Sequence, residues 1–531
     1  MAVVEEDLQE AVEEDDNNSS LILFPFKSCK KMKKTLFLLI TGLTFSISHS
    51  QETSDAIRYA QDNITGTARF RAMSGAFGAV GGDLSSMNIN PAGSAIFSNN
   101  QFGTTLSNIS INNNSNYFGT QTEDCDNAFI MNQVGGVFVF NNRNSNDDWK
   151  KIAIGANFEI TNNFDNNVFS AGTNPTNSVD DYFLAFANGI PLGDLNGLNY
   201  RDLYYDEQQA YFGYRGKVIN PVTNNNSNTQ YTSNVPGGGN YYQENEIYTT
   251  GYNSKLSFNI ATSYKDRIYL GANLNVHITD YRRSSSFYEE NDNPFEPTET
   301  ISQLSFNNNL YTYGNGFSFQ LGAIAKVTQD LRLGLAYESN TWYELYDEVS
   351  QSLYTTRQAE GGPELYADIN PNIINVYDSY TLQTPAKWTG SLAYIFGKSG
   401  LISVDYSIKD YSNTKYKPTS DAGFRQLNST INNDLTTNHE FRIGGEYKIK
   451  RFSLRGGYRF EGSPYKNETI AGDLNSYSGG LGYNFGATKV DLAYSYAERK
   501  SNQGFFATGF TDGANIKSKL NNVSLTLLFE L

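Results

Sequence analysis

The sequence predicts an all-β fold, a 14-stranded antiparallel transmembrane β-barrel with an N-terminal hatch inside its lumen. Three observations predict it. Apolar and polar residues alternate with a period of two from about residue 250 to the C-terminus. The connections between the alternating segments are short and long in turn, as in barrels whose short turns share one side of the membrane. Residues 51–100 precede the first strand, do not alternate, and are rich in small residues.

The N-terminus carries an export signal behind an unusual leader. Residues 1–31 hold eight acidic residues and three lysines, and we expect them to be an extension of the gene model. Residues 32–50 have the order of a secretory signal peptide: two lysines, an apolar stretch from Leu36 to Phe45, and small residues that end at Ser50. We therefore expect translation to start at residue 32 and the mature chain to begin at Gln51.

Composition excludes several classes of protein. The net charge of −16 and the isoelectric point near 4.8 argue against nucleic acid as a partner. Aromatic residues make up 14% of the chain, which is too many for a disordered protein. Past the signal, Cys125 is the single cysteine, so no disulfide within the chain and no cysteine metal site are expected. No apolar run after the signal reaches the length of a membrane-spanning helix.

The strands are predicted from hairpin units. Residues 254–264 and 268–278 alternate on either side of a three-residue turn, which is typical of a β-hairpin. Short turns are expected at about 142–149, 265–267, 328–330, 398–400, 450–451 and 486–489. Long loops are expected at about 112–126, 165–253, 282–313, 340–385, 412–436, 463–473 and 500–517. With both termini in the periplasm, every short turn is periplasmic and every long loop extracellular, in a barrel that covers residues 101–531.

A soluble sandwich or propeller fits less well. A sandwich seldom needs a dozen strands of ten or more residues, and a propeller shows a repeat of fixed period. Aromatic residues also stand at many strand ends, as in the interfacial girdles of membrane barrels. The count of fourteen strands is even, as bacterial outer-membrane barrels require.

The inward phase of the strands predicts an object inside the barrel. Glycines recur on that phase, at Gly155, Gly271, Gly322, Gly334, Gly444, Gly457, Gly480 and Gly482. Glycine inside a strand marks a bend or the close approach of another segment. Residues 51–100 are the candidate for that segment, and they contain Asn90, Pro91 and Ala92.

At these residues the chain resembles the FadL-type outer-membrane transporters of long-chain fatty acids and other hydrophobic compounds. The Gly/Ala-rich segment followed by Asn90, Pro91 and Ala92 is similar to the hatch motif of that family. Further similarities are at 331–339, 384–387, 444–447 and 454–458, and together they cover the exported chain except the long loops. Two features depart from the family: Leu531 stands where an aromatic is usual, and the loop at about 165–253 differs, so ligand preference is not carried over.

The resemblance implies a function and a route. It implies a channel for hydrophobic compounds such as long-chain fatty acids, with capture at the extracellular loops, hatch-gated diffusion, and lateral exit where the third strand kinks. That strand is about 150–164, and Gly155 is the candidate break. Alternatives are a protein-secretion shuttle of the type IX kind, a receptor for haem or another hydrophobic ligand, and an outer-membrane hydrolase.

Charged residues on the inward phase have two interpretations. Arg442, Arg455, Arg459 and Glu446 lie on neighbouring strands. They either form cross-strand ion pairs that hold the wall and dock the hatch, or an arginine binds a ligand carboxylate, which guanidinium recognises in two-pronged geometry.

No residue pattern predicts catalysis, a metal or a cofactor. His277 and His439 are far apart in sequence and neither has a nucleophile motif beside it. The glycines at 75, 78 and 81 follow no strand, so they are not a nucleotide-binding fingerprint. The loop at about 165–253 is rich in aromatics and includes a possible helix at 201–216; a hydrophobic capture groove and a cover over the barrel mouth both fit it.

The expected partners follow from these interpretations. They are a hydrophobic small-molecule ligand, outer-membrane lipid and the barrel-assembly machinery, with no nucleic acid. We expect a monomer in the outer membrane of a Gram-negative bacterium.

Overall fold

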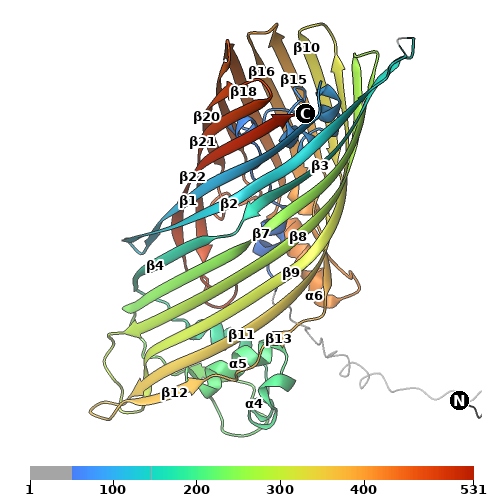
Figure 1. Ribbon diagram of the computed structural model, residues 1–531. Coiled ribbons are helices and arrows are strands. Elements are labelled where there is room, and N and C mark those ends of the chain that lie inside the picture. The colour runs from blue at the N-terminus through green and yellow to red at the C-terminus, as the bar shows by residue number, and fades with distance from the viewer. Residues whose placement is uncertain (1–50, 145) are drawn as a thin grey trace, which may run out of the picture. The chain divides into compact units, whose positions relative to one another are not determined.

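The structure is a computed structural model that describes residues 51–144 and 146–531; the expected leader and signal peptide, residues 1–50, lie outside the described residues. β1 (Gln101–Tyr117) pairs with β2 (Thr120–Asn141) and also with the last strand, β22 (Gly513–Glu530). This pairing closes one antiparallel sheet into a barrel (Figure 1). The predicted fold class is confirmed.

The described wall contains fourteen strands when interrupted strands are counted once. Four of them are interrupted: β3 (Trp149–Asn163) with β4 (Asn166–Asn174); β10 (Leu331–Glu338) with β11 (Trp342–Gln358); β12 (Leu365–Ile369), β13 (Asn375–Val376), β14 (Tyr380–Gln383) and β15 (Lys387–Phe396); and β16 (Gly400–Asp410) with β17 (Lys415–Lys417). The others are β7 (Tyr241–Tyr264), β8 (Ile268–Asn291), β9 (Thr300–Lys326), β18 (Thr437–Ile449), β19 (Phe452–Glu461), β20 (Leu474–Asn484) and β21 (Thr488–Gly504).

The period-two pattern sorts side chains between lipid and lumen. On β7, Phe258 and Ile260 are 52% and 57% exposed, whereas Ser257 and Asn259 between them are buried. The same division runs around the wall, so large apolar side chains form a continuous exposed belt. A belt of this size is far larger than the apolar patches of soluble proteins and is the surface that faces the bilayer.

The short turns lie at one end of the barrel, where the sequence predicts them. At the other end, three of the connections predicted as long loops differ from the prediction. The expected loops at 112–126, 282–313 and 340–385 are largely strand, because β1 and β2 meet in a two-residue turn, β8 and β9 continue to Asn291 and from Thr300, and β11 to β14 fill most of the third loop. In these extensions both faces of the strand carry Asn, Ser and Tyr, so the pairing continues although the apolar alternation has ended.

The wall is tall on one side and low on the other. β7, β8 and β9 have 24, 24 and 27 residues, whereas β15, β19 and β20 have 10, 10 and 11. Figure 1 shows the long strands extending beyond the short ones, to the end that carries α4 and α5 at the bottom of the view. Only about ten tilted residues are needed to cross a bilayer, so the tall side extends beyond it.

The outer connections contain most of the helices. Residues 175–240 hold α3 (Asp180–Ala187), α4 (Leu192–Gly197), η3 (Tyr200–Asp202), α5 (Tyr205–Arg215) and the β5–β6 ribbon (Ile219–Pro221 and Tyr231–Ser233). α5 confirms the helix expected at 201–216. The connection from β16 to β18 holds η4 (Tyr411–Asn413) and α6 (Ala422–Asp434). None of the helices in the described part of the chain is long and apolar enough to cross a membrane.

Residues 51–100 fold inside the barrel as four short helices (Figure 1). These are α1 (Thr53–Ala60), α2 (Ala68–Ala72), η1 (Leu84–Asn88) and η2 (Pro91–Ile96). We call this segment the hatch. α1 packs near the outer end, in an apolar cluster with Phe424 and Ile431 of α6 and with Tyr343 of the wall. α2 and the 3₁₀ helices contact the inner faces of β20 to β22 and of β7 to β9.

Candidate functional site

The hatch motif is hydrogen-bonded to backbone groups of the hatch and of the wall through the side chain of Asn90. Asn90 caps η2: its side-chain oxygen accepts a hydrogen bond from the backbone N–H of Ala92 at 3.1 Å. Its side-chain nitrogen donates to the carbonyls of Gly78, at 2.7 Å, and of Ala323 on β9, at 3.1 Å. Pro91 starts the 3₁₀ helix with no N–H to satisfy. The three residues therefore join two turns of the hatch to the wall.

The inward glycines provide the space that the hatch occupies. A Cβ built at Gly271 or Gly322 would collide with Pro91 or Asn90, and one at Gly444 would collide with Met73. The same holds for the other predicted inward glycines, with Gly155 against Met87, Gly334 against Gly78, Gly457 against Met73 and Ser74, and Gly480 against Ala72. Gly482 instead leaves room for wall side chains. The prediction that these glycines make room for an object in the lumen holds for all of them except Gly482.

The predicted arginines are brought together and are occupied by wall carboxylates. Arg442 lies 3.6 Å from Asp405 and 3.8 Å from Glu440. Arg455 binds Glu446 at 2.7 Å and Asp491 at 2.5 Å. Arg459 binds Glu440 at 2.6 Å and also Glu461. These contacts favour the first interpretation of the sequence, in which the arginines hold the wall.

Two of these wall groups also hold the hatch. Glu446 lies between Arg455 and Arg69 of α2, which it binds at 2.9 Å. The carboxylate of Asp405 accepts hydrogen bonds from the backbone N–H groups of Phe77 and Gly78, at 3.0 and 3.1 Å. Burial lowers the pKa of Arg69, but Glu446 outweighs this effect and holds the pKa above its usual range. Arg69 and Glu446 therefore remain an ion pair at any physiological pH.

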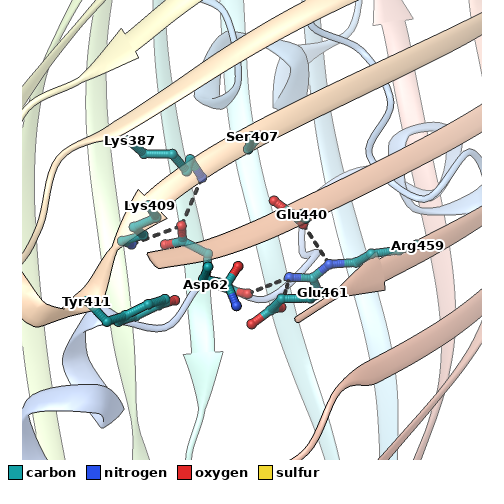
Figure 2. A pocket seen from close by; sticks show the side chains of 9 residues that line it. Asp62, Lys387, Ser407, Lys409, Tyr411, Glu440, Arg459 and Glu461 are labelled. Atoms are coloured by element: carbon teal, nitrogen blue, oxygen red, sulfur yellow. Dashed lines mark hydrogen bonds and ion pairs between the residues drawn. The ribbon is translucent and has the colours of Figure 1, made fainter. Parts of the chain in front are cut away.

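Asp62 anchors the segment between α1 and α2 (Figure 2). Its carboxylate lies 2.8 Å from Lys387 Nζ and 3.1 Å from Lys409 Nζ, and its backbone carbonyl accepts a hydrogen bond from Arg459 at 3.0 Å. Burial raises the pKa of the Asp62 carboxyl, but the two lysines outweigh burial and hold the pKa well below its usual range. Asp62 therefore docks the hatch as a carboxylate.

A polar cavity of about 40 Å³ begins beside Asp62. It is lined by Tyr59, Gln61, Asp62, Thr161, Asn253, Lys255, His277, Glu338, Ser339, Thr341, Tyr343, Thr384, Pro385 and Lys409. A volume of about 10–15 Å³ holds one water, so this space holds a few waters or one small polar group. It reaches from the hatch to Thr161, at the end of β3.

The third wall strand breaks beside this cavity. Pairing of β2 with β3 ends at Gln133 and Glu159, and the strand is interrupted between Asn163 and Asn166. Beyond the interruption β4 pairs with β7 alone in the described sheet. The third strand therefore loses its backbone pairing with β2 at this point, and β4 contacts the first hairpin through side chains, as where Thr122 donates to the Phe169 carbonyl.

The structure places this break away from Gly155. Gly155 pairs with Val137 of β2 and with Asn259 of β7 in an uninterrupted part of β3. It lacks a side chain because Met87 of the hatch packs against it. Glycine marks close approach as well as breaks, and the pattern of one strand does not distinguish the two.

Hatch residues line the inner side of the break. Asn63 hydrogen-bonds Asn162, Thr65 hydrogen-bonds Glu159, and the backbone N–H of Gly66 donates to Asn132 at 2.7 Å. All three wall partners lie where β2 and β3 separate. Three hydrogen bonds thus join the hatch to the wall at the gap, beside the ring of Tyr59, which packs against Phe164.

The aromatic outer connection is a cover and not an open groove. Phe183 of α3 and Phe212 of α5 are fully buried, against Phe306 of β9 and Leu353 of β11. Residues 505–512, between β21 and β22, add Phe505 and Phe510 to the same cluster. We call residues 175–240 the cap. Of the two interpretations of this loop, the cover is the one that the structure supports.

The histidines lie apart. His277 faces the lumen, with Nε2 2.9 Å from Ser318 Oγ and Nδ1 3.3 Å from the Tyr343 hydroxyl. His439 is on the outer face and bonds Tyr406 at 2.8 Å. A hydrolytic triad needs a carboxylate to orient the histidine, and Tyr343 occupies that place. Residues 51–144 and 146–531 contain no group of three or more His, Cys, Asp or Glu able to hold a metal ion.

Sequence reasoning missed the residues around the cavity. Lys255, Lys387 and Lys409 are on the inward phase of their strands, and this pattern was the available signal. Asp62 is in the hatch, where no periodicity indicates direction. Asp62 and the three lysines meet because β7, β15 and β16 surround the same turn of the hatch.

The chain is similar in sequence to one protein family and in structure to solved outer-membrane proteins. A model of the family described as outer membrane protein transport protein (OMPP1/FadL/TodX) matches residues 220–521. No curated protein matches the chain. A FadL homologue of Pseudomonas aeruginosa has a similar structure, with a TM-score of 0.53 and 14% identity over 88% of this chain and 99% of that one. The toluene transporter TodX of Pseudomonas putida has a TM-score of 0.48 and 14% identity, over 89% and 100% of the two chains.

Proposed function

Because the chain belongs to the outer membrane protein transport family (OMPP1/FadL/TodX), we propose that it carries hydrophobic compounds such as long-chain fatty acids inward across the outer membrane. One observation carries this proposal: the third strand is interrupted between Asn163 and Asn166, just after its pairing with β2 has ended, and the hatch lies directly behind this break. A polar lumen is a poor route for an apolar molecule. A break in the wall offers it a path from the hatch into lipid.

The proposed route has three steps. The ligand is captured at the extracellular end, the hatch rearranges, and the ligand leaves sideways through the broken third strand. The hydrogen bonds of Asn63, Thr65 and Gly66 to the wall are the contacts that must open. A hydrogen bond contributes about 0.5–1.5 kcal/mol net between neutral groups and about 1.5–3 kcal/mol to a charged one, so opening these three contacts, one of them to the Glu159 carboxylate, costs on the order of a few kcal/mol.

Locking the hatch tests the proposal. Ser74 of the hatch and Ser478 of β20 have their hydroxyl oxygens 2.7 Å apart. In a Cys125→Ser background, the double variant Ser74→Cys/Ser478→Cys should form a disulfide. We expect uptake of labelled oleate by cells to fall on the order of tenfold under oxidising conditions, because a disulfide exchanges far more slowly than the hatch contacts, and to recover with a reductant.

A second pair of serines supplies the control. Ser107 of β1 and Ser524 of β22 are 2.8 Å apart and both belong to the wall. Their disulfide should form without changing oleate uptake. Unimpaired uptake with a fully oxidised hatch pair would contradict hatch gating. No oleate uptake by the unlocked protein would contradict the transport of fatty acids itself and favour the haem-receptor or secretion-shuttle alternatives.

Localisation and assembly belong to the same proposal. The apolar belt and the exported N-terminus support insertion into the outer membrane by the barrel-assembly machinery, with outer-membrane lipid against the belt. Pairing of β1 with β22 closes the wall, so the first and last strands have no free edge. A closed wall supports a monomer, and an enzymatic role has no support in the site.

A further inference from the structure

Charge is unevenly distributed between the two ends of the barrel. The chain has a net charge of −16, and the cap holds six acidic and three basic residues. At the opposite end, at the top of Figure 1, two turns carry cations and no acidic residue: 397–399 with Lys398, and 450–451 with Lys450 and Arg451. All three residues are exposed. We call these three residues the basic rim.

The two turns of the basic rim lie side by side. β16 pairs with β18, so that Gly400 is opposite Tyr447. The backbone N–H of Lys448 donates to the carbonyl of Ser399 at 2.7 Å, which joins the strand ends that carry the two turns. The three cations therefore belong to one sector of the barrel end.

The basic rim lacks a counter-charge of its own. Among the described residues, none of its three side chains forms an ion pair or a hydrogen bond. The carboxylate of Glu446 lies near the end of the same strand, but it is buried and binds Lys448, Arg69 and Arg455. The positive charge of the basic rim is therefore open to a partner from outside the chain.

A second pair of turns at the same end differs in this respect. The turns 142–148 and 265–267 are also neighbours, since the backbone N–H of Lys265 donates to the Asp148 carbonyl at 2.7 Å. Together they contain three cations and three carboxylates: Arg143, Lys265, Arg267, Asp147, Asp148 and Asp266. Lys265 lies 3.3 Å from Asp148. A surplus of positive charge is thus a property of the basic rim and not of every short turn.

The basic rim borders the apolar belt that faces the bilayer. Tyr447 and Phe452, on either side of one turn, are both 58% exposed, and Phe396 beside the other is 49% exposed. Tyr483 packs against Phe452 and Phe485, with ring centroids 4.7 and 4.5 Å apart. Aromatic rings at strand ends mark the level of the membrane interface. The cations of the basic rim therefore stand at the depth of lipid head groups.

We propose that the basic rim binds the phosphate groups of anionic phospholipids in the leaflet that the short turns face. A phosphodiester supplies the negative charge that the basic rim lacks, and the guanidinium of Arg451 suits two of its oxygens at once. The adjoining aromatic rings favour a lipid over a soluble acidic protein, because rings and cations follow one another on the outer wall. The proposal is independent of the compound that the barrel carries. It rests on the proposed insertion into the outer membrane, with the short turns in the periplasm.

A matched pair of lipids tests this site. Purified full-length protein in a non-ionic detergent is titrated with fluorescent phosphatidylglycerol and with phosphatidylcholine of identical acyl chains, which differ in net charge. The variant Lys398→Gln/Lys450→Gln/Arg451→Gln removes the charge of the basic rim. We expect it to bind phosphatidylglycerol on the order of tenfold more weakly than wild type, because each basic side chain near the membrane surface attracts anionic lipid. Binding of phosphatidylcholine should stay within about twofold of wild type.

The neutral pair of turns supplies the control. Arg143→Gln/Lys265→Gln/Arg267→Gln removes the same number of cations at the same end of the barrel. Its effect should not reach the basic rim, because β9 and β10 lie between the two pairs of turns and about 0.15 M salt screens charges more than about 8 Å apart. It should therefore bind phosphatidylglycerol like wild type.

A charge-preserving variant completes the experiment. Lys398→Arg/Lys450→Arg should retain phosphatidylglycerol binding, and compact migration of unheated protein on a denaturing gel checks that each variant is folded. Unchanged phosphatidylglycerol binding without the basic rim, or an equal loss in the control variant, would overturn the site. Wild-type protein that binds the two lipids equally well would overturn it too.

Discussion

The hatch and the cap both obstruct the lumen, and their contacts with the wall differ. The hatch meets the wall through apolar clusters and also through ion pairs and hydrogen bonds, as at Asp62 and Asp405. The cap meets it mainly through fully buried aromatic rings, as at Phe183 and Phe212. Polar contacts can be exchanged for water at small net cost, whereas opening an aromatic cluster exposes apolar surface. We therefore expect the hatch to move more readily than the cap.

The largest effect should follow from breaking the cap. Phe212→Ala removes a fully buried ring, and such truncations cost about 3–5 kcal/mol. We expect protease added to intact cells to cleave within residues 175–240 much faster in this variant, while residues 51–100 stay protected. Tyr204→Ala removes an exposed ring just before α5 and serves as the control. Equal cleavage of the two variants would mean that the aromatic cluster does not hold the cap.

A smaller effect should follow from pushing the hatch off the wall. Gly444→Val places a side chain where Met73 of the hatch lies, and overpacking costs about 1–3 kcal/mol. Each 1.4 kcal/mol changes an equilibrium constant about tenfold, so the fraction of molecules with an undocked hatch should rise. We expect faster entry of a large antibiotic into cells, with an intact barrel.

The neighbouring residue supplies the control for that variant. Gly445 has open space around its Cβ position, with its nearest neighbour, the Leu401 carbonyl oxygen, 3.6 Å away. Gly445→Val should therefore leave antibiotic entry unchanged. Faster entry in both variants would attribute the effect to the strand and not to the hatch.

The smallest effect, of opposite sign in the two regions, should come from acid. The pKa of Asp62 is held well below its usual value of 3.8, so its contribution to hatch docking is complete above 3.8 and is lost as the pH falls through its lower, folded-state pKa. Burial raises the pKa of Asp180 in the cap above 3.8, so the folded cap binds a proton more readily and gains stability as the pH falls through that raised pKa.

Hydrogen exchange measures this contrast. Between pH 7 and 4, exchange within residues 175–240 should slow slightly after correction for the intrinsic rate, while exchange within residues 51–100 stays constant. Below 3.8 the hatch should begin to exchange faster. Asp180→Asn should reduce the first change, and Asp62→Asn should loosen the hatch at neutral pH. A hatch that loosens between pH 7 and 5 would show that Asp62 does not dock it as described.

The candidate site was only partly predictable. Arg442, Arg455 and Arg459 share the inward phase of adjacent strands, so their meeting follows from the pattern, but their occupation by Glu440, Glu446 and Asp491 depends on register. The meeting of Asp62 with Lys387 and Lys409 involves β15 and β16 together with the hatch. No local signal in the sequence reports that combination.

The sequence by itself determined the barrel, its fourteen strands, its short-turn end and the presence of a segment inside it. These properties are local, because alternation and inward glycines are read along one strand at a time. Tertiary structure alone decided where strand three breaks, how far the tall side of the wall extends, that the aromatic connection is a cover, and which lysines hold Asp62. Those properties depend on which residues of distant strands face one another, and packing of the hatch against the wall sets that arrangement.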